Sequence, residues 1–402
     1  MNQKIISDRS PIARRASPQR AISNSALILK AIEHEATEVG LDQISVRAVA
    51  KRAGLTSGAI YARYENVNEM IVALWIEHVS SQFESTLRRS IRAIVNRDAP
   101  AFDQEVTDLL QSPTSIMKLG AEFLVVAQRN DAVGEVVIPE VSRWLIEAGL
   151  NEESSRIDRA AVAIAASIVI GAALRSFITT SNPNLGYVAQ GIRRAFLAAS
   201  PQNRTQSQHT PSATRSATGN HLRDTLIDAT AEVMSKAGFN GATVSRIARK
   251  SGITSGSLYH YYEDKEALIN DAVYELMRAT QNENLEAKRA AAHSHQKNFG
   301  LTDSFNFGLI PDRFTWLRFR QECIIASRHH KTTRLTLKKV LKEIEVQMHE
   351  AFSQLDPQVV SLVNVGEQAI GYGYCSLLGY TALFQSCDFD AIMVQVAQQN
   401  GL

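Results

Sequence analysis

The sequence contains one long motif twice. The segment 40–64 returns 198 positions later as the segment 238–262, without a gap. Positions that are identical in the two copies are Gly40/Gly238, Val46/Val244, Ala50/Ala248, Gly54/Gly252, Thr56/Thr254, Ser57/Ser255, Gly58/Gly256, Tyr61/Tyr259 and Tyr64/Tyr262. Solenoid repeats have periods of about 20 to 50 residues, so this period is far too long for one. We therefore expect a whole domain that has been duplicated and fused.

The duplication continues beyond this motif. Residues 127–129 (Ala-Gln-Arg) match residues 326–328 (Ala-Ser-Arg) at an offset of 199, and Ile170-Gly171 matches Ile370-Gly371 at an offset of 200. The copied unit is therefore about 180 residues long. Between the copies, residues 201–220 are polar and small, a composition that buries no apolar face and predicts a linker.

Composition predicts an all-α protein without a disulfide framework or a membrane span. The pattern is helical from residue 23 onwards, and we find no alternating strand pattern with turn signals. The cysteines, Cys323, Cys375 and Cys387, are odd in number and form no CxxC pair, which favours buried thiols in the cytoplasm. The apolar run 160–174 is shorter than the roughly 18 residues of a membrane-spanning helix, so we expect a core or interface helix.

Each copy of the motif predicts three short helices in a helix-turn-helix arrangement. The first covers residues 23–39 in one copy and 221–237 in the other. A glycine ends this helix, and a second glycine permits the left-handed residue of a tight turn between the next two. Serine or threonine precedes the second and third helices, where its oxygen can cap the backbone. In chain order these positions are Gly40, Ser45, Gly54 and Thr56 in the first copy, and Gly238, Thr243, Gly252 and Thr254 in the second.

The third helix is the element that a helix-turn-helix places in the major groove. At about 100° per residue it has a core face and an outer face. The core face carries Ile60 and Tyr64, or Leu258 and Tyr262. The outer face, which would meet bases, carries Gly58, Ala59, Ala62 and Arg63, or Gly256, Ser257, His260 and Tyr261. Hydroxyls on the flank, suited to phosphate oxygens, belong to Ser57 and Tyr61, or to Ser255 and Tyr259.

Local charge supports nucleic-acid binding, although the whole chain has a net charge of only +2. Neither segment 45–63 nor segment 243–262 contains an acid, which is typical of a phosphate-binding surface. Their basic residues are Arg47, Lys51, Arg52 and Arg63, and Arg246, Arg249 and Lys250. Residues 1–22 are also basic; such a tail either lies along DNA or remains solvated without a specific role.

The segment 244–268 resembles the DNA-binding head of TetR/AcrR-type transcriptional regulators, and about 50 residues of each copy share the resemblance. The resemblance implies a three-helix head followed by a larger helical domain that binds a small molecule and dimerises. It also implies that Tyr61, Tyr259 and Lys265 contact phosphate. The first copy departs from the pattern because Val67 stands in the place of that lysine.

These observations divide the chain into two units of like design. The division is a disordered basic tail (1–22), a first helix-turn-helix domain (23–78), a first helical ligand and dimerisation domain (79–200), a linker (201–220), a second helix-turn-helix domain (221–278) and a second helical ligand and dimerisation domain (279–402). We expect the two units to pair within one chain, while a homodimer of tandem chains remains the alternative. The predicted DNA-binding residues are Ser45, Arg47, Thr56, Ser57, Gly58, Ala59, Tyr61, Ala62, Arg63, Thr243, Arg246, Thr254, Ser255, Gly256, Ser257, Tyr259, His260, Tyr261 and Lys265.

The predicted function is that of a sequence-specific transcriptional regulator, most simply a repressor, that binds double-stranded DNA and an unidentified small-molecule effector. Because the outer faces of the two heads differ, we expect an imperfect palindrome, with Arg63 as the best candidate for a guanine contact. The alternative is a helical small-molecule-binding or interaction module that has lost DNA binding. We predict no cofactor, metal or enzymatic activity, since the sequence shows no nucleophile–base arrangement, phosphate-binding glycine loop or metal cluster.

Overall fold

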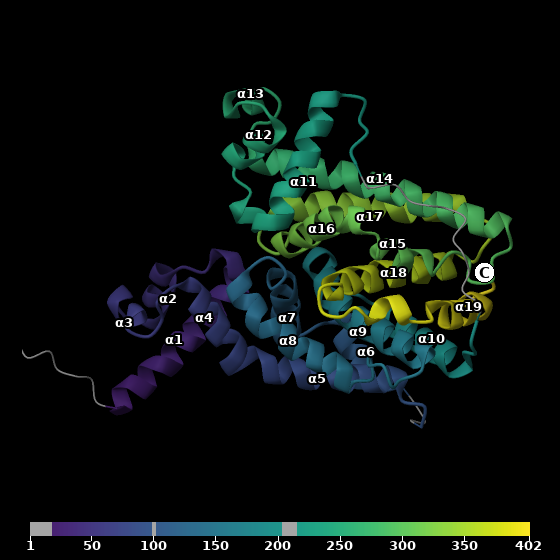
Figure 1. Cartoon of the computed structure of the whole chain (residues 1–402), viewed down its shortest axis with the longest axis horizontal. Coiled ribbons are helices and arrows are strands. Elements are labelled where there is room, and N and C mark those ends of the chain that lie inside the picture. The colour runs from purple at the N-terminus through teal and green to yellow at the C-terminus, as the bar shows by residue number, and fades with distance from the viewer. Residues whose placement is uncertain (1–17, 99–101, 203–214) are drawn as a thin grey trace, which may run out of the picture.

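The computed structural model describes residues 18–98, 102–202 and 215–402, and every regular element in these ranges is a helix (Figure 1). Residues 1–17 of the basic tail and residues 203–214 of the linker lie outside the described residues. The first helix begins at Pro18, so the end of the predicted tail is helical. At the other side of the linker, Ser216 and Thr218 donate hydrogen bonds to Asp224 and so tie this segment to the second half.

Each half consists of a small head followed by a larger helical body. The first half contains α1 (Pro18–Val39), α2 (Val46–Ala53), α3 (Ser57–Tyr61), α4 (Val67–Leu74), α5 (Ser80–Val95), α6 (Gln104–Gln111), α7 (Ser115–Val126), α8 (Asp131–Glu147), α9 (Arg156–Thr179) and α10 (Leu185–Ala198). The second contains α11 (His221–Gly241), α12 (Val244–Ser251), α13 (Ser255–Tyr259), α14 (Lys265–His293), α15 (Asp303–Gly308), α16 (Phe314–Ala326), α17 (Lys331–Ala351), α18 (Pro357–Leu377) and α19 (Phe389–Gln399). Both heads lie at the end of the molecule away from the C-terminus (Figure 1).

No loop separates head from body in either half. In the first half α4 continues through a π-helical segment, η2 (Trp75–Val79), directly into α5; in the second half α14 runs unbroken. The predicted domain boundaries at 78/79 and 278/279 therefore fall inside helices. A π-turn adds one residue to a helix, so positions beyond η2 correspond to the second half at an offset of 197 rather than 198. Each head is therefore joined to its body by a continuous helix.

The apolar run 160–174 lies in α9, which is longer than the sequence analysis assumed. Its 24 residues are long and apolar enough to cross a membrane by composition, yet its apolar window is completely buried within the protein. The helix packs against α18 of the second half, and α10 packs against α19. Helix α9 is thus a core helix between the two halves, as expected, although its length alone would not have excluded a membrane span.

Two glycines let α9 and α18 approach each other more closely than any side chain would allow. A Cβ atom on Gly171 would lie 1.7 Å from the carbonyl oxygen of Ala369, and one on Gly373 would lie 1.9 Å from that of Ser167. Gly371, on another side of α18, meets nothing within 4 Å. The small residues at the contact are therefore required by the distance between the backbones.

Aromatic side chains fill the first body. The ring of Trp75 lies 5.1 Å from Phe123 and 5.9 Å from Trp144, and its Nε1 donates to Glu140 at 2.6 Å.

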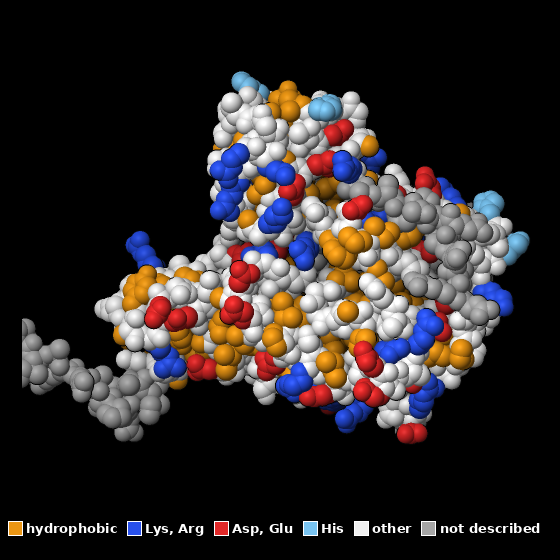
Figure 2. Space-filling model, in the orientation of Figure 1, with side chains coloured by type: hydrophobic (Ala, Val, Ile, Leu, Met, Phe, Trp, Pro, Cys, Tyr) orange, Lys and Arg blue, Asp and Glu red, His pale blue; other side chains and the backbone are white. Residues whose placement is uncertain are grey.

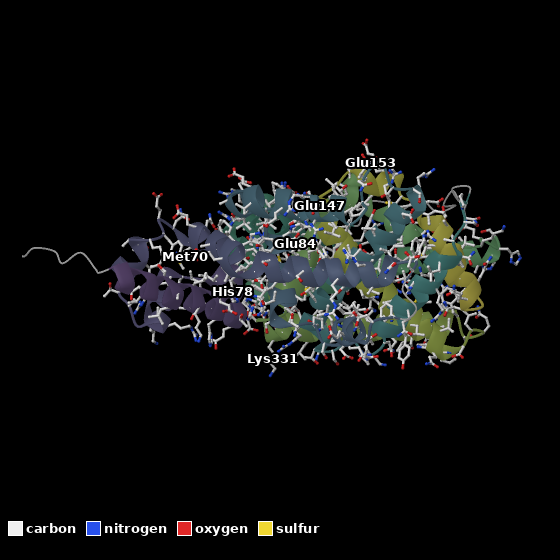
Figure 3. The ribbon with its side chains drawn as sticks, turned by 90° about the horizontal axis from the view of Figure 1, so that it is seen from below. Met70, His78, Glu84, Glu147, Glu153 and Lys331 are labelled. Atoms are coloured by element: carbon white, nitrogen blue, oxygen red, sulfur yellow. The ribbon has the colours of Figure 1, made fainter. Side chains whose placement is uncertain are left out.

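On the surface, Arg88 of α5 forms salt bridges with Glu84 and with Glu147 of α8; the two carboxylates lie near each other in Figure 3.

Candidate nucleic-acid interface

The local geometry of both heads follows the predicted caps and turns. Gly54 and Gly252 adopt the left-handed conformation, with φ of 66° and 74°. The four predicted capping oxygens accept hydrogen bonds from backbone N–H groups three residues later, at 3.0 to 3.4 Å, as N-caps do. They belong to Ser45, Thr56, Thr243 and Thr254. These four residues are therefore placed first of all to begin α2, α3, α12 and α13.

The third helices turn their outer faces to solvent. Ile60 and Leu258 are fully buried on the core side, as predicted. Tyr262 is only half-buried, because its hydroxyl reaches out to donate to Asp271 at 2.6 Å. The tyrosines at the predicted phosphate and base positions are exposed: Tyr61 by 58%, Tyr259 by 55% and Tyr261 by 51%. The remaining outer and flank residues are exposed or half-exposed, namely Ser57, Gly58, Ala59, Ala62, Ser255, Gly256, Ser257 and His260.

Arg63 is exposed, but its guanidinium group contacts neighbours within its own half. Its guanidinium group donates to the hydroxyl of Tyr64 at 3.0 Å and to Ser25, and it lies 3.5 Å from Glu77. The hydrogen bond to Tyr64 and the charge of Glu77 raise the pKa of Arg63 above its ordinary value, against the effect of burial. The side chain ties α3 to α1 and η2, and would have to leave these partners to contact a base.

Lys265 is also held inside its own head. Its ammonium group donates to the carbonyl oxygen of Phe239 at 2.9 Å and lies 4.7 Å from the centre of that ring. Burial lowers the pKa of Lys265. The lysine thus fixes the turn after α11 to the start of α14, and a phosphate contact would require it to release the carbonyl.

Only part of the basic cluster in each head is free of salt bridges, and within that part Arg246 donates to the carbonyl oxygen of Gly241 at 2.9 Å. Arg52 forms salt bridges with Glu35 and Glu38 of α1, and Lys250 forms one with Glu232 of α11. The other four side chains are exposed and form no salt bridge with the described part of the chain: Arg47, Lys51, Arg246 and Arg249. Figure 2 shows Lys and Arg side chains gathered along one side of the second head. These four cations are the strongest candidates for phosphate contacts.

Charged groups from both halves meet beside the heads, which the sequence analysis did not foresee. Arg129 contacts Glu322 and Asp42, each at 2.6 Å. In the reciprocal arrangement Arg328 contacts Glu122 at 2.8 Å and donates to the carbonyl oxygen of Thr37 at 2.7 Å. Each half therefore supplies one arginine to a glutamate of the other half.

This junction also holds the turn that follows α1. The Leu41 N–H donates to Glu122 at 2.6 Å, and both glutamates are almost completely buried. Burial raises the pKa of Glu122 and of Glu322, and the facing arginines oppose that rise. The duplication offered one signal for this site, because Arg129 and Arg328 match at an offset of 199. The junction mechanically connects the first head to both bodies.

The potential metal ligands of the described residues do not form a metal-binding cluster. Among the residues the structure describes, no group of three or more His, Cys, Asp or Glu side chains is arranged to hold a metal ion. The three cysteines lie buried as free thiols. The loop around His293 and His295 is only partly solvated: the histidines are exposed, but Asn298 is buried and donates to Asp390 at 2.6 Å.

Comparison with known proteins matches both heads. The sequence model for bacterial regulatory proteins of the tetR family matches residues 28–74 and 226–272. The HTH-type transcriptional regulator BetI of Vibrio campbellii is similar, with 25% identity over 142 residues that cover 34% of this chain and 71% of that protein. The BetI of Escherichia coli O17:K52:H18 is 25% identical over 165 residues, which cover 39% and 77%. The BetI of Stenotrophomonas maltophilia is 41% identical over 56 residues, which cover 14% and 29%.

The matched segments coincide with α1–α4 and with α11–α14, the heads and the helices that carry them into the bodies. The more extensive alignments cover most of a regulator but little more than a third of this chain, as expected if one half corresponds to one regulator. These relatives are HTH-type transcriptional regulators. The chain therefore carries the tetR-type helix-turn-helix domain twice, in tandem, within one polypeptide.

Proposed function

We propose that one chain binds double-stranded DNA with both heads in the cytoplasm and represses transcription from an imperfect palindrome. The observation that carries this proposal is that two heads with the same framework expose different side chains. Where the first head has Ala59 and Ala62, the second has Ser257 and His260, and all four lie toward solvent. Side chains at such positions read base edges in the major groove, so the two half-sites differ.

Contacts between the halves support a pseudo-dimer made from a single chain. Helix α9 packs along α18, α10 packs against α19, and the helices also contact one another across these pairs. The glycine contacts and the reciprocal arginine–glutamate pairs fix the halves to each other at two separate places. A linker in one polypeptide raises the effective concentration of the partner half to about the millimolar range.

Phosphate binding is assigned to the exposed cations and tyrosines. The four cations that form no salt bridge lie on α2 and α12, and the hydroxyls of Tyr61 and Tyr259 lie on the exposed flank of α3 and α13. Effector control follows from the continuous helices between body and head, because a ligand that favours one arrangement of the bodies changes the placement of the heads. Such a ligand would lower the affinity for DNA.

Selection of bound sequences from a random DNA pool tests the proposal. We expect two unlike half-sites on one face of the duplex, with centres about one helical turn or a multiple apart. Light scattering on the same protein should give the chain mass of 44.3 kDa for the free protein, and that mass plus the mass of one duplex for the complex. A perfect palindrome, or a species of twice the chain mass, would contradict the single-chain arrangement, and the absence of any selected sequence would contradict DNA binding.

Replacing His260 by alanine should relax the base preference of one half-site only. His260 is exposed on the outer face of the second head, while the corresponding residue of the first head is already Ala62. A lost base contact costs about 1 to 3 kcal/mol of discrimination, so we expect about a tenfold or greater loss of preference at one or two positions. Sequencing the DNA selected by the variant measures this. Ala62→Gly is the matched control and should leave the same half-site unchanged.

A further inference from the structure

The interior of the second body is polar at the positions where the first body is apolar. Three of the apolar side chains that helix α5 buries in the first body are each at most 3% exposed. At the offset of 197 that follows η2, the corresponding side chains of α14 are all polar and all line a cavity of about 110 Å³. The corresponding pairs are Phe83 and Thr280, Leu87 and Asn284, and Ile91 and Lys288.

The other walls of the cavity differ from the first body in the same way. Helices α16, α17 and α18 surround the cavity together with α14, and they correspond to α7, α8 and α9. The pairs at offsets of 199 and 200 are Met117 and Trp316, Ala121 and Arg320, Trp144 and Ile344, Ile168 and Gln368, and Leu174 and Tyr374. In the first body two of the larger rings, Phe83 and Trp144, fill the space; their counterparts Thr280 and Ile344 leave it open.

Three hydrogen-bond donors that line this cavity have no acceptor in the described part of the chain. They are the Nε1 group of Trp316, the hydroxyl of Tyr374 and the Nε group of Arg320. Trp316 is 2% exposed and Tyr374 is 1% exposed. Buried donors in native proteins are nearly always paired, because an unpaired one is costly. Three of them around one cavity indicate that a ligand supplies the acceptors.

The charges around the cavity determine the sign of that ligand. Lys288 is neutralised by Glu367 at 2.5 Å, and Arg313 by Glu283 at 2.7 Å. Arg320 forms no salt bridge within the described residues; its guanidinium lies over the rings of Trp316 and Tyr372 and donates to the sulfur of Cys375 at 3.1 Å. The cavity therefore has one uncompensated positive charge beside two neutral donors.

We infer that the effector site lies in the second half alone and takes one compact carboxylate per chain. Arg320 faces the carboxylate, Trp316 and Tyr374 donate to its oxygens, and the apolar part of the ligand packs against Leu317 and Ile344, which also line the cavity. The regulatory meaning of this binding rests on the proposed function, but the binding itself does not. The first half then contributes a rigid, filled body, and only the second responds.

Calorimetry with benzoate and hexanoate, and with benzamide and benzylamine as neutral and cationic comparisons, tests the inference in the absence of DNA. We expect one carboxylate per chain and at least tenfold weaker binding of the amide and the amine. Arg320→Gln should weaken benzoate at least tenfold. Arg318→Gln, the same charge change on an exposed side chain of the same helix, should have no effect.

Thr280→Phe separates loss of the site from loss of the fold. It places the residue of the first half into the cavity, so benzoate binding should disappear while the thermal unfolding midpoint stays the same or rises. The inference is overturned if neither carboxylate binds at millimolar concentration, if two bind per chain, or if Arg320→Gln or Thr280→Phe binds benzoate as the parent does. Because no step uses DNA, a failure to bind DNA would refute the proposed function and leave these results standing.

Discussion

Replacing Gly171 by valine is expected to separate helices α9 and α18 and to lower the free energy of unfolding by about 3 kcal/mol or more. Even the first carbon of the new side chain would lie 1.7 Å from a backbone oxygen of the other half, and neither backbone can yield without moving its helix. Denaturant unfolding measures the loss. Light scattering would show whether the separated halves find partners in other chains and give a species of twice 44.3 kDa.

Gly371→Ala is the matched control for this substitution. It also replaces a glycine, in the other helix of the same pair, but a Cβ there meets nothing within 4 Å. Since alanine also favours helix over glycine by up to about 1 kcal/mol, this variant should be unchanged or slightly more stable. If Gly171→Val unfolded at the same denaturant concentration as Gly371→Ala, the close contact between the halves would be refuted.

Neutralising the four cations of the heads that form no salt bridge is expected to weaken DNA binding by about a thousandfold at physiological salt. The variant changes Arg47, Lys51, Arg246 and Arg249 to glutamine. Each phosphate contact contributes about 0.9 to the slope of log affinity against log salt. The loss of four contacts should therefore reduce the magnitude of that slope by roughly 3 to 4 units. Fluorescence anisotropy in a salt titration measures both quantities, with folding checked by the unfolding midpoint.

A second variant keeps the same net charge change but removes cations from the bodies. Its substitutions are Arg92→Gln, Lys297→Gln, Arg318→Gln and Lys338→Gln, all at exposed positions. Its salt slope should equal that of the parent protein. Equal slopes for the two variants would mean that total charge, and not the placement of four side chains on the heads, governs the affinity.

The heads could be predicted from the sequence almost residue by residue, because their geometry is local. A capping oxygen and the N–H group it accepts from are three residues apart, as with Thr254 and Ser257, and a turn glycine depends only on its own φ. Local reasoning did not predict the partners of Arg63. Whether its guanidinium faces DNA or Glu77 depends on where η2 lies relative to α3, and that distance is set by tertiary packing.

The junction between the halves and the cavity could not be predicted in this way. Arg129 and Glu322 are 193 residues apart, and no local pattern links them. Recognising the cavity from the sequence requires the right alignment of α5 with α14. Phe83 corresponds to Thr280 only when the extra residue of η2 is taken into account. An alignment at the constant offset of the heads would have compared the wrong faces of α5 and α14. The duplication in the sequence showed that the halves are alike, and the helices showed where they differ.

The unlike outer faces of α3 and α13 have a consequence for gene control. An ordinary symmetric dimer sits on its operator equally well either way round. If the chain binds DNA as proposed, its two different reading helices make it asymmetric on the duplex, so the operator sequence fixes its orientation. The half with the open interior would then always point toward the same flanking gene, and a promoter on one side could be governed differently from a promoter on the other.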